Sequence, residues 1–226
     1  MNYFSAKTLN SSNFWYGKDW DLHKLIPGTE KIDDLFSLNE ITCYFIIIYF
    51  AMYFVNTIIL LLIVWKLWKI YDDKLKLEFF CLQLSRFVII YVLLPISLFL
   101  FWVIIPLRVD TNYIAKFENI KEIPDWIKSL FFSAQKNGGV PTNTLPSGHV
   151  AYSLLGVYLL QIIPFQKKSK KVIIYSAWIF FWLIALSTLF CKKHYFLNAI
   201  VAILLIRIFE YLTRKWNRNF IFYFFD

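Results

Sequence analysis

Long stretches without a charged residue constrain this chain more than any other feature of its sequence. The four longest are residues 43–64, 87–107, 172–191 and 195–206. A helix of about 20 apolar residues crosses the roughly 30 Å hydrocarbon core of a membrane. The last run is long enough only if Arg207 and Glu210 lie near the end of its helix, and a shorter run at 150–165 is extended by Ser147 and His149. The sequence therefore predicts an all-α fold, an integral membrane helical bundle with about five transmembrane helices.

Composition supports a membrane protein and argues against other classes. Apolar residues make up 59% of the chain, against about 45–50% in soluble domains. In such a chain the net charge of +9 reflects membrane topology, so we expect no nucleic-acid partner. The charged N-terminal segment does not resemble a cleavable signal peptide. Cys43, Cys81 and Cys191 lack metal-ligand spacing and are interpreted as buried thiols, with a Cys43–Cys191 disulfide as the alternative, so no metal or cofactor is expected.

Lysine and arginine side chains gather in alternate connections between the predicted helices. These basic regions hold Lys66, Lys69, Lys74 and Lys76, then Lys167, Lys168, Lys170 and Lys171, and finally Arg214, Lys215 and Arg218. The positive-inside rule places such regions in the cytoplasm. The N-terminal segment and the long connection at 106–147 are then extracytoplasmic, periplasmic or lumenal. His149 and His194 lie on the same extracytoplasmic side, where short connections between neighbouring helices bring their rings together.

No internal repeat or low-complexity linker divides the chain. We predict one membrane domain over residues 1–226, with an extracytoplasmic or interfacial segment at 1–42, a helical core at 43–213 and a cytoplasmic tail at 214–226. Charged residues inside the core are expected near the helix ends. Arg86 is predicted to extend toward the headgroups or to pair with Glu78.

The outer connection contains a predicted short helix at 124–132. Pro124 begins it, and Trp126, Ile127, Leu130 and Phe131 share one apolar face. Connections of this length often form lids or binding loops. An amphipathic helix at the level of the headgroups is one interpretation. A lid packed over the helix ends is the other.

The two outer histidines each begin an apolar stretch, in a setting suited to proton transfer. Ser147 can cap the helix that follows it, and Gly148 allows an oxyanion to approach the backbone closely. Exposed amides at a helix N-terminus attract phosphate. Lys192 and Lys193 come directly before His194 and add positive charge. This arrangement predicts a phosphate site for a lipid headgroup at the outer membrane surface.

Two motifs carry a family resemblance. The sequence Pro146-Ser147-Gly148-His149 matches one family motif intact. In a second motif Ser187 stands at the family's spacing from His194. Thr188, however, replaces the family's arginine, and Asn198 replaces its aspartate. On these residues, from the second predicted helix to the fifth, the chain resembles the type 2 phosphatidic acid phosphatase superfamily, which includes lipid phosphate phosphatases and related phosphotransferases.

The resemblance implies a lipid phosphatase, a metal-independent phosphoric monoester hydrolase that acts on a lipid phosphate or diphosphate in the bilayer. His194 would attack phosphorus to form a phosphohistidine. His149 would protonate the leaving oxygen and then activate water. The family's first motif, a lysine followed by Arg-Pro, is not recognisable, and Arg108 and Lys116 are its nearest substitutes. The implied phosphate-binding set is Ser147, Gly148, Arg108, Lys116, Lys192, Lys193 and Ser187.

Asn198 puts the orientation of the nucleophile in question. It lies one helical turn after His194, where the family's acid would hold the imidazole. The corresponding Asp-to-Asn change in a serine-protease triad lowers the rate about 10⁴-fold, or roughly 5 kcal/mol. Three outcomes stay open: a weak phosphatase, a rearranged site that uses Asp110 or Glu118, and a protein that binds lipid phosphate without turnover. Transfer of a phospho-headgroup to an alcohol is a further alternative.

Overall fold

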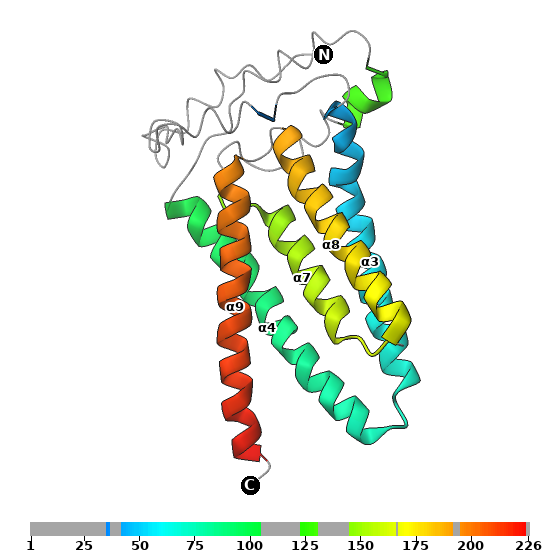
Figure 1. Cartoon of the computed structure of the whole chain (residues 1–226). Coiled ribbons are helices and arrows are strands. Elements are labelled where there is room, and N and C mark those ends of the chain that lie inside the picture. The colour runs from blue at the N-terminus through cyan, green and yellow to red at the C-terminus, as the bar shows by residue number, and fades with distance from the viewer. Residues whose placement is uncertain are drawn as a thin grey trace.

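Apolar helices account for all regular structure in the part of the chain that the structure, a computed structural model, describes (Figure 1). The described residues are 35–36, 42–104, 123–130, 145–165, 167–191 and 195–224. The main elements are η2 (Thr42–Tyr44), α3 (Phe45–Lys69), α4 (Lys74–Ile104), α7 (Gly148–Ile162), α8 (Lys167–Phe190) and α9 (Phe196–Phe224). The predicted all-α class is confirmed.

Among the described residues, four helical segments are long and apolar enough to cross a membrane. They are Thr42–Lys69, Lys76–Phe101, Lys167–Phe190 and Phe196–Lys215. A helix suits this environment because all its central backbone groups are hydrogen-bonded within the segment. Together with the shorter apolar helix α7, these segments form the predicted integral membrane helical bundle.

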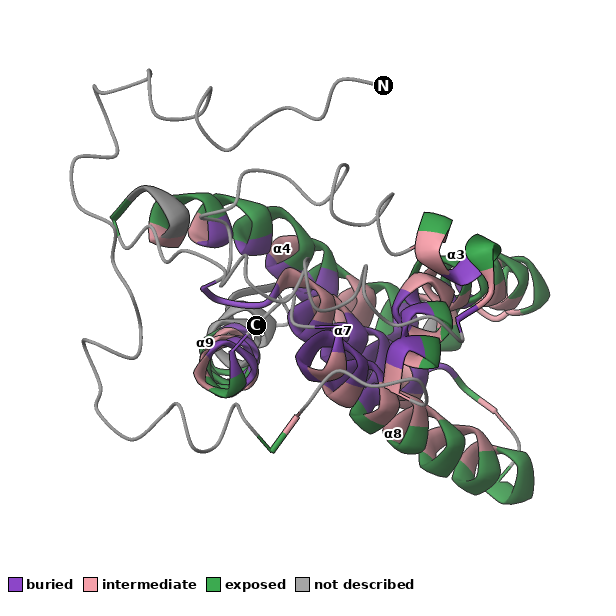
Figure 2. Cartoon of the chain, turned by 90° about the horizontal axis from the view of Figure 1, so that it is seen from above, coloured by how far each residue is buried: buried purple, intermediate pink, exposed green. Residues whose placement is uncertain are grey.

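The short helix α7 is the centre of the bundle. It contacts α3, α4, α8 and α9, and Figure 2 shows its buried surface enclosed by the other helices. Its 15 residues span only about 22 Å, less than the hydrocarbon core. Buried residues run from Val150 to Leu160 with one partly buried exception, Tyr152. Because protein rather than lipid surrounds α7, it does not need the length of a lipid-exposed helix.

Two helices extend beyond the uncharged runs that predicted them. Helix α4 begins at Lys74 and α9 continues to Phe224, so residues 214–224 are helical. Asp73 caps the start of α4, since its Oδ1 accepts a hydrogen bond from the backbone N–H of Lys76 at 3.2 Å. The expected pairing of Arg86 with Glu78 is wrong, because Arg86 lies 3.7 Å from the carboxylate of Glu210 on α9. Packing of α4 against α9 brings these two charges together across the bundle.

The basic connections between the described helices gather at one end of the bundle. The turn from α3 to α4, the turn from α7 to α8 and the C-terminal end of α9 lie at one end (Figure 1). The basic residues of these regions therefore lie together, as the alternation along the chain predicts. Ser147 and His149 lie at the opposite end, beside the start of α9. The assignment of the basic end to the cytoplasm stays a prediction.

The predicted helix in the outer connection is confirmed over residues 125–130. The carbonyl of Pro124 accepts the N–H of Ile127 at 3.0 Å. Ile127 is fully buried in a cluster with Ile46 and Tyr49 of α3, whereas Trp126 is 55% exposed. The helix thus packs over the N-terminal end of α3, as a lid would. Cys43 and Cys191 lie in the same cluster as thiols, so the disulfide alternative is not observed. The expectation of burial is wrong for Cys81, which is exposed.

Candidate active site

The Pro-Ser-Gly-His motif builds the N-terminus of the central helix. Ser147 has an extended backbone and its Oγ accepts a hydrogen bond from the N–H of Val150 at 3.4 Å. Its carbonyl accepts the N–H of Ala151 at 3.0 Å. The predicted capping role of Ser147 is therefore confirmed. The cap fixes the start of α7 at Gly148 and places His149 in the first turn.

A backbone hydrogen bond joins the two motifs. The N–H of Ser147 donates to the carbonyl of Asn198 at 3.1 Å. Both residues are fully buried, and beside them Leu145 packs against Tyr195. The starts of α7 and α9 thus lie side by side, as the predicted topology requires. Motif residues that are distant in sequence meet at one end of the bundle.

Two tyrosines of α3 hold the imidazole of His149. The hydroxyl of Tyr53 lies 3.0 Å from Nε2. The ring of Tyr49 stacks on the imidazole with 4.0 Å between centroids and 29° between planes. Tyr53 also meets the imidazole edge-on at 5.5 Å. Sequence reasoning missed both tyrosines, although their spacing of one helical turn in the outer half of the first apolar run was an available signal.

These contacts fix the imidazole without removing its chemistry. Stacking on Tyr49 limits rotation of the ring, and an aromatic pair of this kind contributes about 0.5–1.5 kcal/mol beyond burial. A phenol both donates and accepts, so Tyr53 can hydrogen-bond to Nε2 in either protonation state of His149. The ring is partly buried rather than enclosed. It can therefore exchange a proton with a group at this end of the bundle.

Asn198 contributes a buried amide with open hydrogen-bonding capacity. Its side chain is fully buried, and neither Oδ1 nor Nδ2 has a hydrogen-bond partner among the residues that the structure describes. An unsatisfied buried polar group costs about 1–3 kcal/mol. The side chain therefore requires a partner at the N-terminal end of α9. Its position as third residue of that helix is the place of the family's acid.

The end of α8 is neutral at the positions of the second motif. Ser187 and Thr188 are fully buried. The hydroxyl of Ser187 donates to the carbonyl of Ile184, and that of Thr188 to the carbonyl of Ala185, both at 2.7 Å. Thr188 thus satisfies its hydroxyl within its own helix and supplies no positive charge where the family has arginine. Ser187 keeps only its acceptor lone pairs for another group.

Gly148 is not required by packing. A Cβ added there would meet Cδ1 of Leu98 at 3.5 Å, an ordinary van der Waals contact. The absence of a side chain at Gly148 instead leaves the backbone open on the side from which an anion would approach. The other predicted site residues, His194, Lys192, Lys193, Arg108, Lys116, Asp110 and Glu118, lie outside the described residues. Among the described residues no group of three or more potential metal ligands occurs.

Comparison with known proteins identifies the family. A family model described as the PAP2 superfamily matches residues 35–212. The match includes both motifs, helices α3, α4, α7 and α8, and the first part of α9. No curated protein and no solved structure was found to be similar to the chain. The match covers most of the chain, so the protein belongs to the PAP2 superfamily, the phosphatidic acid phosphatase group that its motifs resemble.

Proposed function

We propose that this protein is a membrane-embedded, metal-independent lipid phosphatase that works through a phosphohistidine. Membership of the PAP2 superfamily indicates phosphatase-type activity in general. The observation that carries the finer proposal is the hydrogen bond from Ser147 to Asn198, which joins the starts of α7 and α9. Because of this bond, His149 and the residue of the family's acid lie at one end of the bundle. The substrate is a phosphate or diphosphate on a lipid headgroup.

The proposed reaction is a double displacement. A ring nitrogen of His194 attacks phosphorus, the bond from phosphorus to the lipid oxygen breaks, and His149 gives its proton to that oxygen. Water then attacks phosphorus and His149 takes a proton from it. The phosphorus–nitrogen bond breaks, and inorganic phosphate leaves. No step requires a metal ion or an added cofactor.

Charge on the transferring phosphoryl group is stabilised by the helix N-terminus and by cations. The backbone amides in the first turn of α7, which begins at Gly148 after the cap Ser147, attract an anion because they lie at the positive end of the helix dipole. Tyr49 and Tyr53 orient His149 toward the same region. The further phosphate ligands that we propose are Arg108, Lys116, Lys192, Lys193 and Ser187. The site faces the extracytoplasmic side, opposite to the basic end of the bundle.

The test is release of phosphate from a panel of lipid phosphates by the detergent-purified protein, with a chelator present. We expect turnover that survives chelation and is lost in His194→Ala and His149→Ala. The third histidine of the chain provides the matched control, since His23→Ala lies outside both motifs. A phosphoenzyme trapped with labelled substrate should be acid-labile and base-stable, as phosphohistidine is. Turnover that depends on a divalent metal, or that persists without His194, would refute the proposal.

The neutral residue at position 198 favours a second candidate, a lipid-phosphate-binding protein without turnover. Asn198 brings no negative charge to stabilise a phosphorylated imidazole. In that case short-chain phosphatidate binds while no substrate of the panel is hydrolysed. An arm with an added acceptor alcohol separates hydrolysis from transfer of the phospho-headgroup, because only transfer forms a new phosphate ester.

A further inference from the structure

A polar cavity lies between α4 and α8, far from His149. It has a volume of about 490 Å³, and side chains of α4, α7, α8 and α9 line it. Helix α4 packs against α7 and α9, whereas α8 packs against α3 and α7. Helix α7 therefore lies between α4 and α8 and forms one wall of the cavity (Figure 2). Gln161, which lines the cavity, is about 18 Å along α7 from His149. The cavity is therefore a separate feature at the basic end of the bundle.

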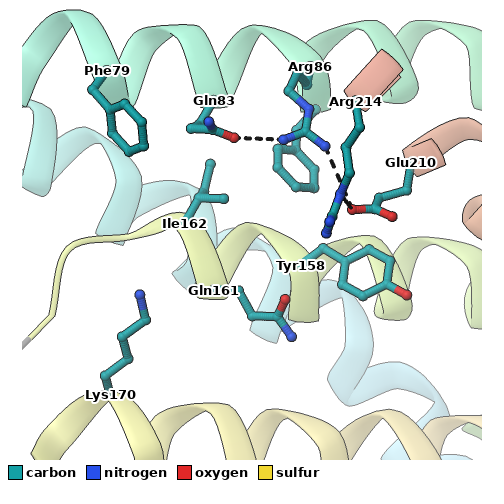
Figure 3. Close-up of a pocket in the computed structure, with 10 residues that line it drawn as sticks. Phe79, Gln83, Arg86, Tyr158, Gln161, Ile162, Lys170, Glu210 and Arg214 are labelled. Carbon is teal, nitrogen blue, oxygen red and sulfur yellow. Dashed lines mark hydrogen bonds and ion pairs between the residues drawn. The ribbon is translucent and has the colours of Figure 1, made fainter. Parts of the chain in front are cut away.

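The cavity carries an excess of positive charge. Arg86 Nη2 lies 3.7 Å from Glu210 Oε1, and Arg214 Nε binds the same oxygen (Figure 3). Only 11% of the Arg86 side chain and 12% of the Glu210 side chain are exposed. The one carboxylate of Glu210 thus forms ion pairs with two guanidinium groups. With Lys170 the lining has three positive charges against one negative charge. Arg86 and Glu210 are largely buried and therefore weakly screened by salt, whereas the side chain of Arg214 is 64% exposed.

Two potential hydrogen-bond donors of this lining have no partner among the described residues. Arg86 Nε and Tyr158 Oη are buried and have no hydrogen-bond partner among the described residues. Lys170 extends from α8 toward the cavity (Figure 3). A phosphate group matches such a lining, because it supplies negative charge and several strong acceptor oxygens. Unsatisfied donors and surplus charge therefore favour the same kind of ligand.

Apolar side chains form the rest of the wall. Phe87 is buried, Ile162 is partly buried, and Phe79 is 66% exposed on the outer surface of α4. A ligand whose phosphate group meets Arg86 can therefore continue along an apolar surface. We propose that this cavity binds the phosphate group of an anionic amphiphile, from the leaflet opposite to the candidate active site. Free phosphate shares the headgroup chemistry, and the test below separates the two sources.

The first test measures protection of individual lysines. The full-length His194→Ala protein in neutral detergent is acetylated with dioctanoyl phosphatidate, dioctanoylglycerol or inorganic phosphate present, and each lysine is quantified by mass spectrometry. Lys171, the exposed neighbour of Lys170 outside the lining, is the internal control. We expect phosphatidate to slow acetylation of Lys170 several-fold and leave Lys171 unchanged, with no effect of dioctanoylglycerol. Equal protection by inorganic phosphate would support the site with a free anion as its ligand, and no selective protection by either phosphate would overturn the proposal.

The second test compares binding by two matched variants. Lys170→Gln should weaken binding of dioctanoyl phosphatidate roughly tenfold, the value of one charge-assisted hydrogen bond. Lys171→Gln should leave it unchanged. Any phosphate site at the outer histidines contributes equally to both variants, so their difference reports the cavity alone. Equal affinities of the two variants would overturn the proposal, whereas failure of the histidine mechanism would leave this comparison intact.

Discussion

The substitution Asn198→Asp tests the proposed mechanism most directly. Position 198 is the third residue of α9 and is fully buried beside Ser147. A carboxylate there would restore the group that the family uses to orient the nucleophilic histidine. In a serine-protease triad the reverse change lowers the rate about 10⁴-fold, which corresponds to roughly 5 kcal/mol. That value is the upper limit for the gain.

Burial of the new carboxylate reduces this gain. Moving an unpaired carboxylate out of water costs several kcal/mol, which the imidazolium of His194 offsets only in the proposed geometry. The first turn of α9 assists, because an acidic group at a partly buried helix N-terminus gains up to about 2 kcal/mol from the dipole. The aspartate also replaces an amide whose two polar atoms have no partner among the described residues. We therefore expect an increase in kcat of between tenfold and 10⁴-fold.

The assay is phosphate release at saturating lipid substrate, with thermal unfolding followed by tryptophan fluorescence to confirm folding. Asn198→Leu is the control, because leucine keeps the branching of the side chain at Cγ, although it is larger, and removes both polar atoms. It should lower activity further if the amide binds the imidazole. A folded Asn198→Asp protein with unchanged kcat would refute the assignment of this position. Wild-type activity in Asn198→Leu would refute any role of the side chain.

Three further substitutions probe the surroundings of the two polar sites. Tyr53→Phe keeps the edge-on ring and removes the hydroxyl at 3.0 Å from His149, so kcat should fall about two- to tenfold, as expected for one hydrogen bond of roughly 0.5–1.5 kcal/mol; unchanged kcat would contradict a positioning role. Gly148→Ala should leave thermal stability nearly unchanged, since among the described residues its Cβ would meet Leu98 at an ordinary 3.5 Å, and should raise KM for the lipid phosphate. A loss of stability with normal KM would show that packing selects glycine. Glu210→Gln leaves Arg86 buried without its carboxylate and should reduce the free energy of unfolding by roughly 3–5 kcal/mol, measured by unfolding in detergent. A change below about 1 kcal/mol would indicate that water or lipid already compensates the charge of Arg86.

The boundaries of the helices are not fully predicted by local sequence rules. The uncharged run at 87–107 covers only part of α4, which begins at Lys74. Charge content marks only the part of a helix that must lie in hydrocarbon. The additional turns carry Arg86, whose charge is compensated by Glu210 of another helix. Such compensation depends on how two helices rotate and cross, which no local pattern encodes.

The sequence alone determined the class of fold, the helices that cross the membrane and the motif residues at the start of α7. These follow from local physics, because apolar runs partition into lipid as helices and Ser147 caps the helix next to it. Only the tertiary structure decided that Tyr49 and Tyr53 contact His149 and that Arg86, Glu210 and Arg214 meet at a cavity. Contacts of this second kind join residues from different helices. They depend on helix rotation and tilt, which the packing of the whole bundle sets.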